Sequence, residues 1–362
     1  MAHRDSGRRL IVNADDFGKS PSINEAIIRA HREGILTSAS LMVNGDAFQE
    51  AVTMAKATPS LGVGLHLTLV CGKSTLPHGE IPGLVDPFGN FSDSPVKTGF
   101  RYFATQRLRG QLRYEIAAQF KKFHATDLPL DHVNGHLNMH LHPTVFSLLS
   151  NHYLEWGIGN IRLTRDPYSL NARVAPGPWF YRRSHSFIFN WLSARAEPSL
   201  RERNIRYTDR VFGLLQNARV NEQFLTALLP LLPKGDSELY CHPSLDAFKH
   251  EFAALTSPRV RDLIDELGIA LTTYRGLGEV AFARTVEPDT RHVPFAKARR
   301  KTSADNSPED SDKPRRQPKS ANSNYGKTNR DTDSRPHLRS YRGGLSEQGF
   351  KANRRGSGNQ SQ

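Results

Sequence analysis

Strand-like and helix-like stretches alternate along residues 8–285, and this alternation constrains the fold more than any other sequence feature. Short β-rich runs read LIVNAD, SASLMVNG and LGVGLHLTLV, and helical stretches such as SINEAIIRAHREGI separate them. A single helix between two strands is the kind of connection that parallel neighbours need. The sequence therefore predicts an α/β fold with a parallel sheet, either open or closed into a barrel.

Local signals set some element boundaries. Ser22 and Glu25 have capping-box spacing at the start of the first helix, and Gly34 indicates its end. Residues 70–100 hold many Gly and Pro and indicate a long loop, whereas 166–200 are expected to be irregular and aromatic. Further helices are expected at 109–125, 143–157 and 221–233, and further strands at 128–134, 158–165 and 237–243.

The composition changes after residue 285. Residues 286–362 contain 17 Lys and Arg against 9 Asp and Glu, a net charge of +8 out of +13 for the whole chain. This segment is polar and lacks apolar periodicity, so it cannot bury enough surface to offset its ordering entropy. We predict a folded domain at 8–285 and a disordered basic tail at 286–362. Because the excess charge lies in the tail, no specific nucleic-acid partner is expected.

Cysteine content and hydropathy indicate a compartment. Cys71 and Cys241 are the only cysteines, too few for a disulfide framework, which favours a reducing environment. No segment reaches the apolar length of about 20 residues that spans a bilayer. The sequence predicts a cytoplasmic protein. The stretch GPWFYRRSHSFIFNWL either packs over the rim of the fold or forms a sugar platform or lipid-contacting surface. Contact with the inner face of a membrane and homo-oligomerisation are left open.

Polar side chains follow four predicted strands. Asp15 and Asp16 follow LIVN, and His66, His136 and His242 lie at or near the ends of three later strands. The carboxyl ends of parallel strands meet on one face of the fold, where ligands bind. We therefore expect these five side chains to be neighbours. The alternative for an isolated Asp pair is that it merely caps the following helix.

The run DHVNGHLNMHLHP alternates polar side chains at every second position. A strand would place them all on one face, although the spacing of four between some histidines also suits a helix. Asn134-Gly135 is a poor helix interior, so a strand followed by a loop is favoured. The alternating residues are His132, Asn134, His136, Asn138, His140 and His142.

Carboxylates and imidazoles in one place suit a divalent cation with open positions for water and substrate, with Mg²⁺ and Zn²⁺ both open. Such a cation acidifies a bound water, a second carboxylate can remove the proton, and a further histidine can protonate a leaving amine. The pattern therefore indicates metal-assisted hydrolysis. Arg162 and Arg165, near the same face, either meet substrate hydroxyls or form solvated ion pairs.

Five motifs, in order, resemble those of the YdjC-like, ChbG-type carbohydrate deacetylases: IVNADDFG, SASLMVNG, GLHL, DHVNGHLNMHLHP and ELYCHP. The resemblance covers about residues 8–285. The stretches INEAIIRAHREGILTSASLMVNG and IPGLVDPFGNF resemble the HpnK branch, which is associated with hopanoid biosynthesis. The family resemblance implies a distorted, TIM-like (β/α) barrel that removes an N-acetyl group from an amino sugar. The branch implies an N-acetylglucosaminyl hopanoid glycolipid as the substrate.

The resemblance also implies roles for residues that match its motifs. Asp16, His66 and His136 would hold the metal, Asp15 would be the general base, and His242 the general acid. Asn138 stands where the family often has a histidine; Asn can hydrogen-bond substrate but cannot carry a proton near neutral pH. Asn138 and His140, with Arg162 and Arg165, are assigned to substrate binding.

Three other functions remain open at this point. The substrate could be a chitooligosaccharide or another N-acetylated saccharide. The same fold could carry a metal-dependent phosphoesterase, because fold does not fix chemistry. A third alternative is an RNA- or membrane-binding protein that acts through its basic tail and has an inactive barrel.

Overall fold

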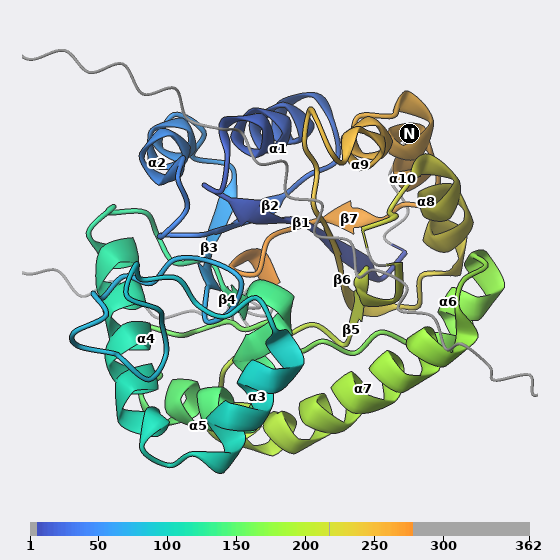
Figure 1. Ribbon diagram of the computed structural model, residues 1–362. Coiled ribbons are helices and arrows are strands. Elements are labelled where there is room, and N and C mark those ends of the chain that lie inside the picture. Colours follow the sequence, from blue (N-terminus) through green and yellow to red (C-terminus); the bar gives the residue numbers. More distant parts are fainter. Residues whose placement is uncertain (1–5, 217, 278–362) are drawn as a thin grey trace, which may run out of the picture. The chain divides into compact units, whose positions relative to one another are not determined.

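A parallel sheet organises the computed structural model, which describes residues 6–216 and 218–277 (Figure 1). The spatial order of its strands is β4-β3-β2-β1-β6-β5, and β7 pairs with β1 on the side of β2. Every pairing between these strands is parallel. The strands are β1 (Arg8–Phe17), β2 (Ser38–Leu41), β3 (Gly62–Leu67), β4 (Val133–Gly135), β5 (Arg210–Phe212), β6 (Gly235–Cys241) and β7 (Ala270–Leu271).

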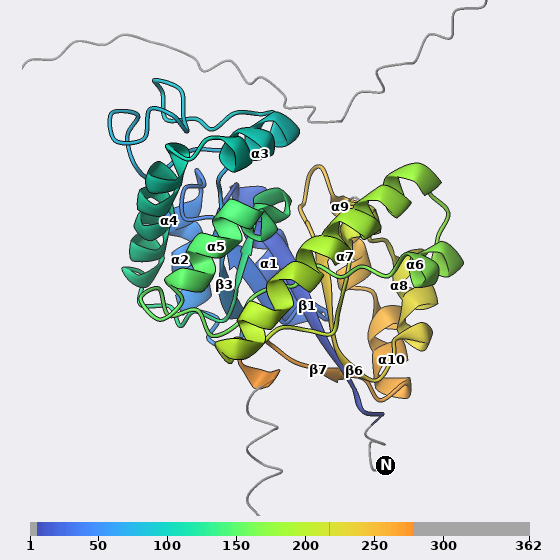
Figure 2. The same cartoon turned by 90° about the horizontal axis from the view of Figure 1, so that it is seen from below.

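Helices surround this sheet (Figures 1 and 2). The α-helices are α1 (Pro21–Glu33), α2 (Phe48–Lys56), α3 (Pro95–Ala104), α4 (Leu108–His124), α5 (Pro143–Asn151), α6 (Tyr168–Val174), α7 (Trp179–Glu202), α8 (Glu222–Leu228), α9 (Lys249–Leu255) and α10 (Pro258–Glu266). Three 3₁₀ helices are η1 (His136–Leu141), η2 (Leu214–Gln216) and η3 (Leu229–Leu231). Every residue of β2 and β3 is buried, as expected for parallel strands covered on both faces. None of these helices is both long and apolar enough to cross a bilayer.

The sheet curls so that residues 158–165 contact both of the outer strands of the sheet, β4 and β5. The amide of Arg162 donates to the carbonyl of Val133 on β4, at 3.0 Å. Three residues later, the carbonyl of Arg165 accepts from the amide of Val211 on β5, also at 3.0 Å. Residues 158–165, predicted as a strand, form only isolated bridges. They nevertheless link β4 to β5 and bring Arg162 into the centre of the fold.

The prediction for residues 166–200 is wrong, and so is the predicted cap of the first helix. Residues 166–200 were expected to be irregular but contain α6 and most of α7. The buried side of α7 consists mainly of small or polar residues, including Ser186, Ser193 and Ala196, while aromatic side chains are exposed. This inverted pattern hides the apolar periodicity of a helix. Ser22 and Glu25 do not form the predicted capping box. The cap of α1 is Ser20, whose Oγ accepts from the amide of Ile23, and Pro21 follows it in the first turn, where proline is favoured.

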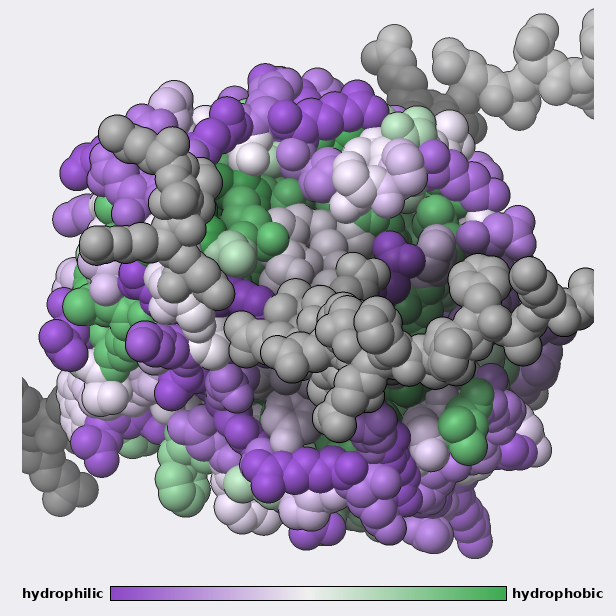
Figure 3. Space-filling view, turned by 180° about the vertical axis from the view of Figure 1, so that it is seen from behind, coloured by the Kyte–Doolittle hydropathy of each residue, from purple (hydrophilic) through white to green (hydrophobic). Residues whose placement is uncertain are grey.

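The remaining surface is mixed. Seen from behind, hydrophilic side chains gather around much of the outline of the molecule (Figure 3). The predicted disordered tail, 286–362, lies outside the described residues, so its boundary at residue 285 stays a prediction.

Candidate active site

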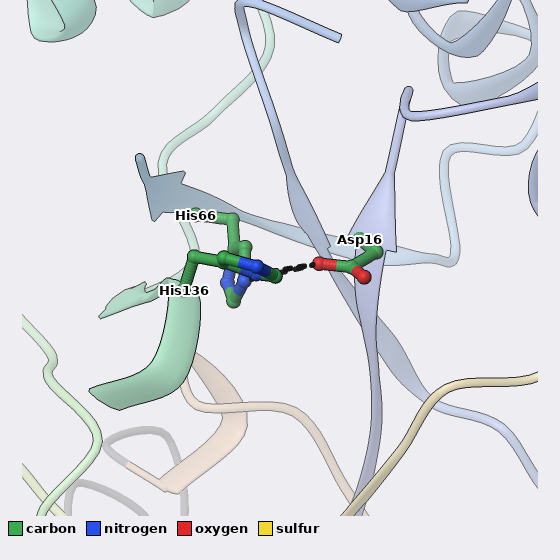
Figure 4. Close-up of side chains that lie close together, drawn as sticks. All are labelled: Asp16, His66 and His136. Atoms are coloured by element: carbon green, nitrogen blue, oxygen red, sulfur yellow. Dashed lines mark hydrogen bonds and ion pairs between the residues drawn. The ribbon is translucent and has the colours of Figure 1, made fainter. Parts of the chain in front are cut away.

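Three predicted metal ligands converge at the carboxyl ends of the strands (Figure 4). Asp16 lies at the end of β1, His66 lies near the end of β3, and His136 is the first residue of η1, directly after β4. One donor atom from each side chain lies within 4.8 Å of the others. Asp16 Oδ1 is 3.1 Å from His136 Nδ1 and 3.4 Å from His66 Nε2. This spacing is what a shared cation requires, and the donor set suits a divalent metal.

An irregularity in β1 directs the two adjacent aspartates to different partners. A regular strand would point neighbouring side chains to opposite faces of the sheet, so Asp15 and Asp16 would not both reach the same site. The pairing of β1 with β2 shifts between Ala14 and Phe17, and Asp16 has a φ of 68°. Asp is one of the few residues that tolerate this left-handed conformation. The bulge therefore gives Asp15 and Asp16 separate environments at the same end of the strand.

Asn134 determines which ring nitrogen of His66 carries the proton. The Asn134 amide nitrogen donates to Asp15 and to Ser40, so its oxygen faces His66 and accepts from Nδ1 at 2.7 Å. With Nδ1 protonated, Nε2 carries the lone pair. This buried Nε2 has no hydrogen-bond partner within the described residues. An unpartnered lone pair aimed at Asp16 fits a metal ligand.

The charges around Asp16 keep it ionised. Burial alone raises the pKa of Asp16, but the charges of His136 and Lys19 hold it well below its usual range. For His66, burial lowers the pKa, whereas Asp15 and Asp16 raise it above the usual value. Lys19 Nζ lies 2.8 Å from Asp16 Oδ2 and was not among the predicted site residues. Its only sequence signal is its position three residues after Asp16.

Asp15 is held by a buried arginine rather than by the histidines. Arg162 donates from both terminal nitrogens to the two carboxylate oxygens of Asp15, at 2.7 and 2.9 Å. Burial raises the pKa of Asp15, but the charge and hydrogen bonds of Arg162 together with the charges of His66 and His242 hold it below the usual range. Asn13 adds a further hydrogen bond to Oδ1, at 2.9 Å. Asp15 is thus an ionised, precisely oriented carboxylate beside the three converging side chains.

Arg162 itself belongs to a buried network. Its guanidinium also donates to Glu238 on β6, at 2.7 Å, and lies 4.2 Å from the centre of the Tyr240 ring. Tyr274 donates to the second oxygen of Glu238, at 2.6 Å. Arg162 is fully buried, so this geometry gives it the role of positioning Asp15 and offers no support for direct contact with substrate. Glu238 was missed because a single charge in a strand carries no motif.

His242 lies one residue beyond β6 and is half-buried. Its Nδ1 has no hydrogen-bond partner among the described residues, and its ring packs edge-on against Tyr240 at 5.8 Å. It is close enough to Asp15 to lower the pKa of that carboxyl electrostatically. His242 therefore lies near Asp15 with a buried ring nitrogen that no described residue hydrogen-bonds.

Comparison with known proteins identifies the family of this chain. A model of the YdjC-like protein family matches residues 9–266. The chain belongs to this family. A carbohydrate deacetylase from Geobacillus stearothermophilus is 33% identical over 272 residues, which are 74% of this chain and 97% of that protein. A chitooligosaccharide deacetylase from Serratia marcescens is 28% identical over 269 residues, 74% of this chain and 98% of that protein.

Two further relatives bear on coverage and fold. A carbohydrate deacetylase from Brevibacillus brevis is 40% identical over 141 residues, 39% of this chain, and this match spans about half of that protein, 54%. A crystal structure from Enterococcus faecalis V583, of a protein provisionally named for cellobiose-phosphate cleavage, superposes with a TM-score of 0.57. It is 24% identical and covers 75% of this chain and 98% of that chain. This likeness establishes a shared fold.

The histidine-rich run of this YdjC-like chain does not share one face. The strand ends at Gly135 and η1 begins, with Leu137 and Asn138 in the left-handed region. Alternation is lost there, and only His136 reaches Asp16. Asn134 contacts His66 and Asp15. The remaining members have partners elsewhere: His132 contacts Ser40 and Asp131, Asn138 contacts Thr164, His140 contacts the carbonyl of Arg162, and His142 contacts the carbonyl of Gly99.

Three residues assigned to substrate binding have internal partners. Burial lowers the pKa of His140 to about 3, so this fully buried ring is neutral. The Asn138 oxygen accepts from Thr164 at 2.9 Å, and its left-handed backbone is one that Asn tolerates. Arg165 pairs with Glu197 on α7. These contacts within the protein account for the positions of His140, Asn138 and Arg165. Their assignment to substrate binding stays a prediction.

Proposed function

We propose that this chain is a metal-dependent carbohydrate deacetylase that hydrolyses the N-acetyl group of an amino sugar. One observation carries the proposal: the unpartnered Nε2 of His66 converges with Asp16 and His136 beside the ionised Asp15. The relatives named carbohydrate and chitooligosaccharide deacetylases add independent support.

Asp16, His66 and His136 would hold a divalent cation, through Oδ1, Nε2 and Nδ1. The cation would acidify a bound water and polarise the acetamide oxygen. Two imidazoles and one carboxylate suit Zn²⁺, while a site that keeps several waters also accepts Mg²⁺. We leave the choice between these two ions to a direct metal titration.

Asp15 is assigned as the general base. Arg162 keeps it charged and therefore able to accept a proton, and also fixes the direction in which its oxygens point. A carboxylate with a lowered pKa is a weak base, so its efficiency depends on an acidified water and on geometry. Asp15 takes the proton of the water as oxygen adds to the carbonyl carbon of the acetamide.

His242 is assigned as the general acid. As the carbon–nitrogen bond breaks, this side chain delivers a proton to the departing nitrogen, so that the products are acetate and a free amine. Its unpartnered Nδ1 and its proximity to Asp15 support this role. We also infer that the curled sheet, bridged by residues 158–165, is a distorted TIM-like (β/α) barrel.

For the substrate we propose an N-acetylglucosaminyl hopanoid glycolipid, on the strength of the branch motifs in the sequence. Chitooligosaccharides are the alternative, and the relative from Serratia marcescens favours them. The purified full chain should be incubated with each compound, and acetate release and product mass should be measured. The true substrate loses one acetyl group in exchange for hydrogen.

Two controls make this experiment decisive. His66→Ala protein should release no acetate above background, because it lacks one cation ligand. A parallel assay for phosphate release from phosphomonoesters tests the phosphoesterase alternative. Phosphate release that depends on His66, without acetate release from any N-acetylated saccharide, would overturn the proposed reaction.

A further inference from the structure

In the part of the chain that the structure describes, solvent-exposed Phe and Trp side chains are confined to two segments. Among the described residues, seven such side chains are exposed. Three lie on α3 or in the loop before it: Phe88, Phe100 and Phe103. The other four lie on the first half of α7: Trp179, Phe180, Phe187 and Trp191. Scattered exposed apolar residues are ordinary, but aromatic groups concentrated in this way indicate an interaction surface.

The charged side chains of both helices are basic, whereas the loop that holds Phe88 carries the exposed Asp86 and Asp93. Residues 94–114, which include α3, contain five Lys or Arg and no Asp or Glu. Residues 179–196 of α7 contain three Arg and no acidic residue. One of these arginines, Arg182, is buried, whereas Arg183 and Arg195 are exposed. The exposed aromatic side chains of α3 and α7 thus lie on helices whose charged side chains in these ranges are basic.

Both groups lie on the side of the molecule that holds the candidate active site. Figure 2 shows α3 and the amino-terminal part of α7 at the side toward which β1 runs, and Figure 1 shows them on different sides of the strand ends. Asp16 lies at that end of β1. Leu137, adjacent to His136, is also half-exposed there. The aromatic helices therefore flank the face where Asp16, His66 and His136 converge.

We propose that α3 and residues 179–191 of α7 form a docking surface for an anionic lipid bilayer, which we term the aromatic rim. Phe and Trp side chains insert at the boundary between headgroups and acyl chains, and Lys and Arg are attracted to anionic headgroups. Docking through this rim turns the candidate active site toward the bilayer. A lipid-linked substrate then reaches Asp16 without leaving the membrane surface.

Charge distinguishes this occupant from a second copy of the chain. A symmetric dimer through the rim would bring two basic surfaces together, which is repulsive. An anionic bilayer complements the same charges. Docking itself does not depend on the reaction assigned above, so the two can fail separately. Only the delivery of a lipid-linked substrate to Asp16 rests on the proposed function.

Vesicle sedimentation of the full chain tests the proposal. Wild-type protein should bind vesicles of phosphatidylcholine mixed with phosphatidylglycerol more tightly than vesicles of phosphatidylcholine alone. The double variant Phe100→Glu/Phe187→Glu should bind the anionic vesicles at least about tenfold more weakly. The matched control is Leu154→Glu, because Leu154 is equally exposed but lies outside the rim. All three proteins keep residues 278–362, so binding by that basic segment cancels in the comparison.

Tryptophan fluorescence gives a second readout that needs no variant. The chain has three Trp residues; Trp156 is buried, and the other two, Trp179 and Trp191, are exposed on α7. Binding through the rim should shift the emission to shorter wavelength, and brominated lipids should quench it. Equal vesicle binding by wild type and the double variant, or unchanged emission at saturating vesicles, would overturn the proposal. So would a wild-type dimer that ignores vesicles and becomes monomeric in the double variant.

Discussion

Asp15 and Asp16 are neighbours in the sequence but have different partners in the fold. The guanidinium of Arg162 holds Asp15, whereas Asp16 faces His66 and His136. The sequence motif alone allowed the two carboxylates to exchange roles. Their contacts support the assignment of Asp16 to the cation and Asp15 to proton transfer.

Asp15→Asn should separate these two roles. The amide cannot accept the proton of water, so turnover should fall by a factor of about 100 or more. Cation affinity should change little, because Asp15 is not among the three converging ligands. Acetate release and calorimetric metal titration measure the two quantities, with Asp16→Asn as the contrasting variant that loses cation binding. Full activity of Asp15→Asn would remove Asp15 as the base.

Arg162→Met should destabilise the fold as well as reduce activity. The substitution leaves the buried carboxylates of Asp15 and Glu238 without the guanidinium that pairs with both. Such a loss typically costs about 3–5 kcal/mol of unfolding free energy. Urea denaturation gives the free energy of unfolding. Arg165→Met is the control, because it breaks a partly exposed pair with Glu197 and should cost about 0–1 kcal/mol. Equal losses in the two variants would contradict a buried positioning role for Arg162.

Asp166 makes stability depend on pH. Burial raises its pKa from 3.8 to about 7, while hydrogen bonds from Leu215 and Asn171 only partly counter this. Between about pH 4 and 7 the folded state therefore holds a proton that the unfolded state has released. The free energy of unfolding that this carboxyl contributes therefore falls as pH rises through that range, by up to about 4 kcal/mol. It levels off at higher pH.

Asp166→Asn should remove this dependence, since an amide does not ionise. Urea unfolding of both proteins at pH 5 and pH 8 measures it. The variant should gain stability relative to wild type at the higher pH. A difference between the two proteins that is the same at both pH values would rule out titration of Asp166 in this range.

Elements were predictable where apolar periodicity and boundary signals agreed. The strand that leads to Asp16 and the helix that ends near Gly34 lie where the sequence places them. The 24-residue helix α7 was missed because its exposed face carries the aromatic side chains. Residues 158–165 have strand-like composition but pair only at isolated positions. They lie between β4 and β5 and contact each of these strands at only a few residues.

Close packing between β3 and β4 predicts an effect for a small substitution. A methyl group at Gly64 would come within 2.6 Å of the carbonyl oxygen of His132, which is backbone and cannot move alone. Gly64→Ala should therefore separate the strands, cost about 1–3 kcal/mol in unfolding free energy, and weaken metal binding through His66, two residues later. Gly79→Ala is the control, because nothing lies within 4 Å of its added methyl. Unchanged stability and metal affinity in Gly64→Ala would contradict this packing argument.

At the scale of the whole molecule, the candidate site joins residues 120 positions apart. A cation bound by Asp16, His66 and His136 stabilises only the state in which β1, β3 and η1 are assembled. At a metal concentration about 100 times Kd, the folded state should gain about 2.7 kcal/mol. Thermal unfolding with and without a chelator measures this gain as a change in Tm.

His66→Ala should make Tm insensitive to the chelator, whereas His152→Ala, a change near the surface, should preserve the response. His152 pairs with Glu155 rather than with a member of the site. A Tm that responds to metal equally in His66→Ala and wild type would place the cation elsewhere.

The sequence by itself determined the parallel α/β architecture and the set of side chains at the strand ends, because periodicity and strand–helix alternation are local properties. Only the tertiary structure decided how those side chains are paired. Arg162, Glu238 and Lys19 acquire their partners through the curl of the sheet and the bulge in β1, and such contacts depend on distances between segments far apart in the chain. Hydrogen bonds and charge pairs act over a few ångströms in space, so sequence spacing cannot specify them.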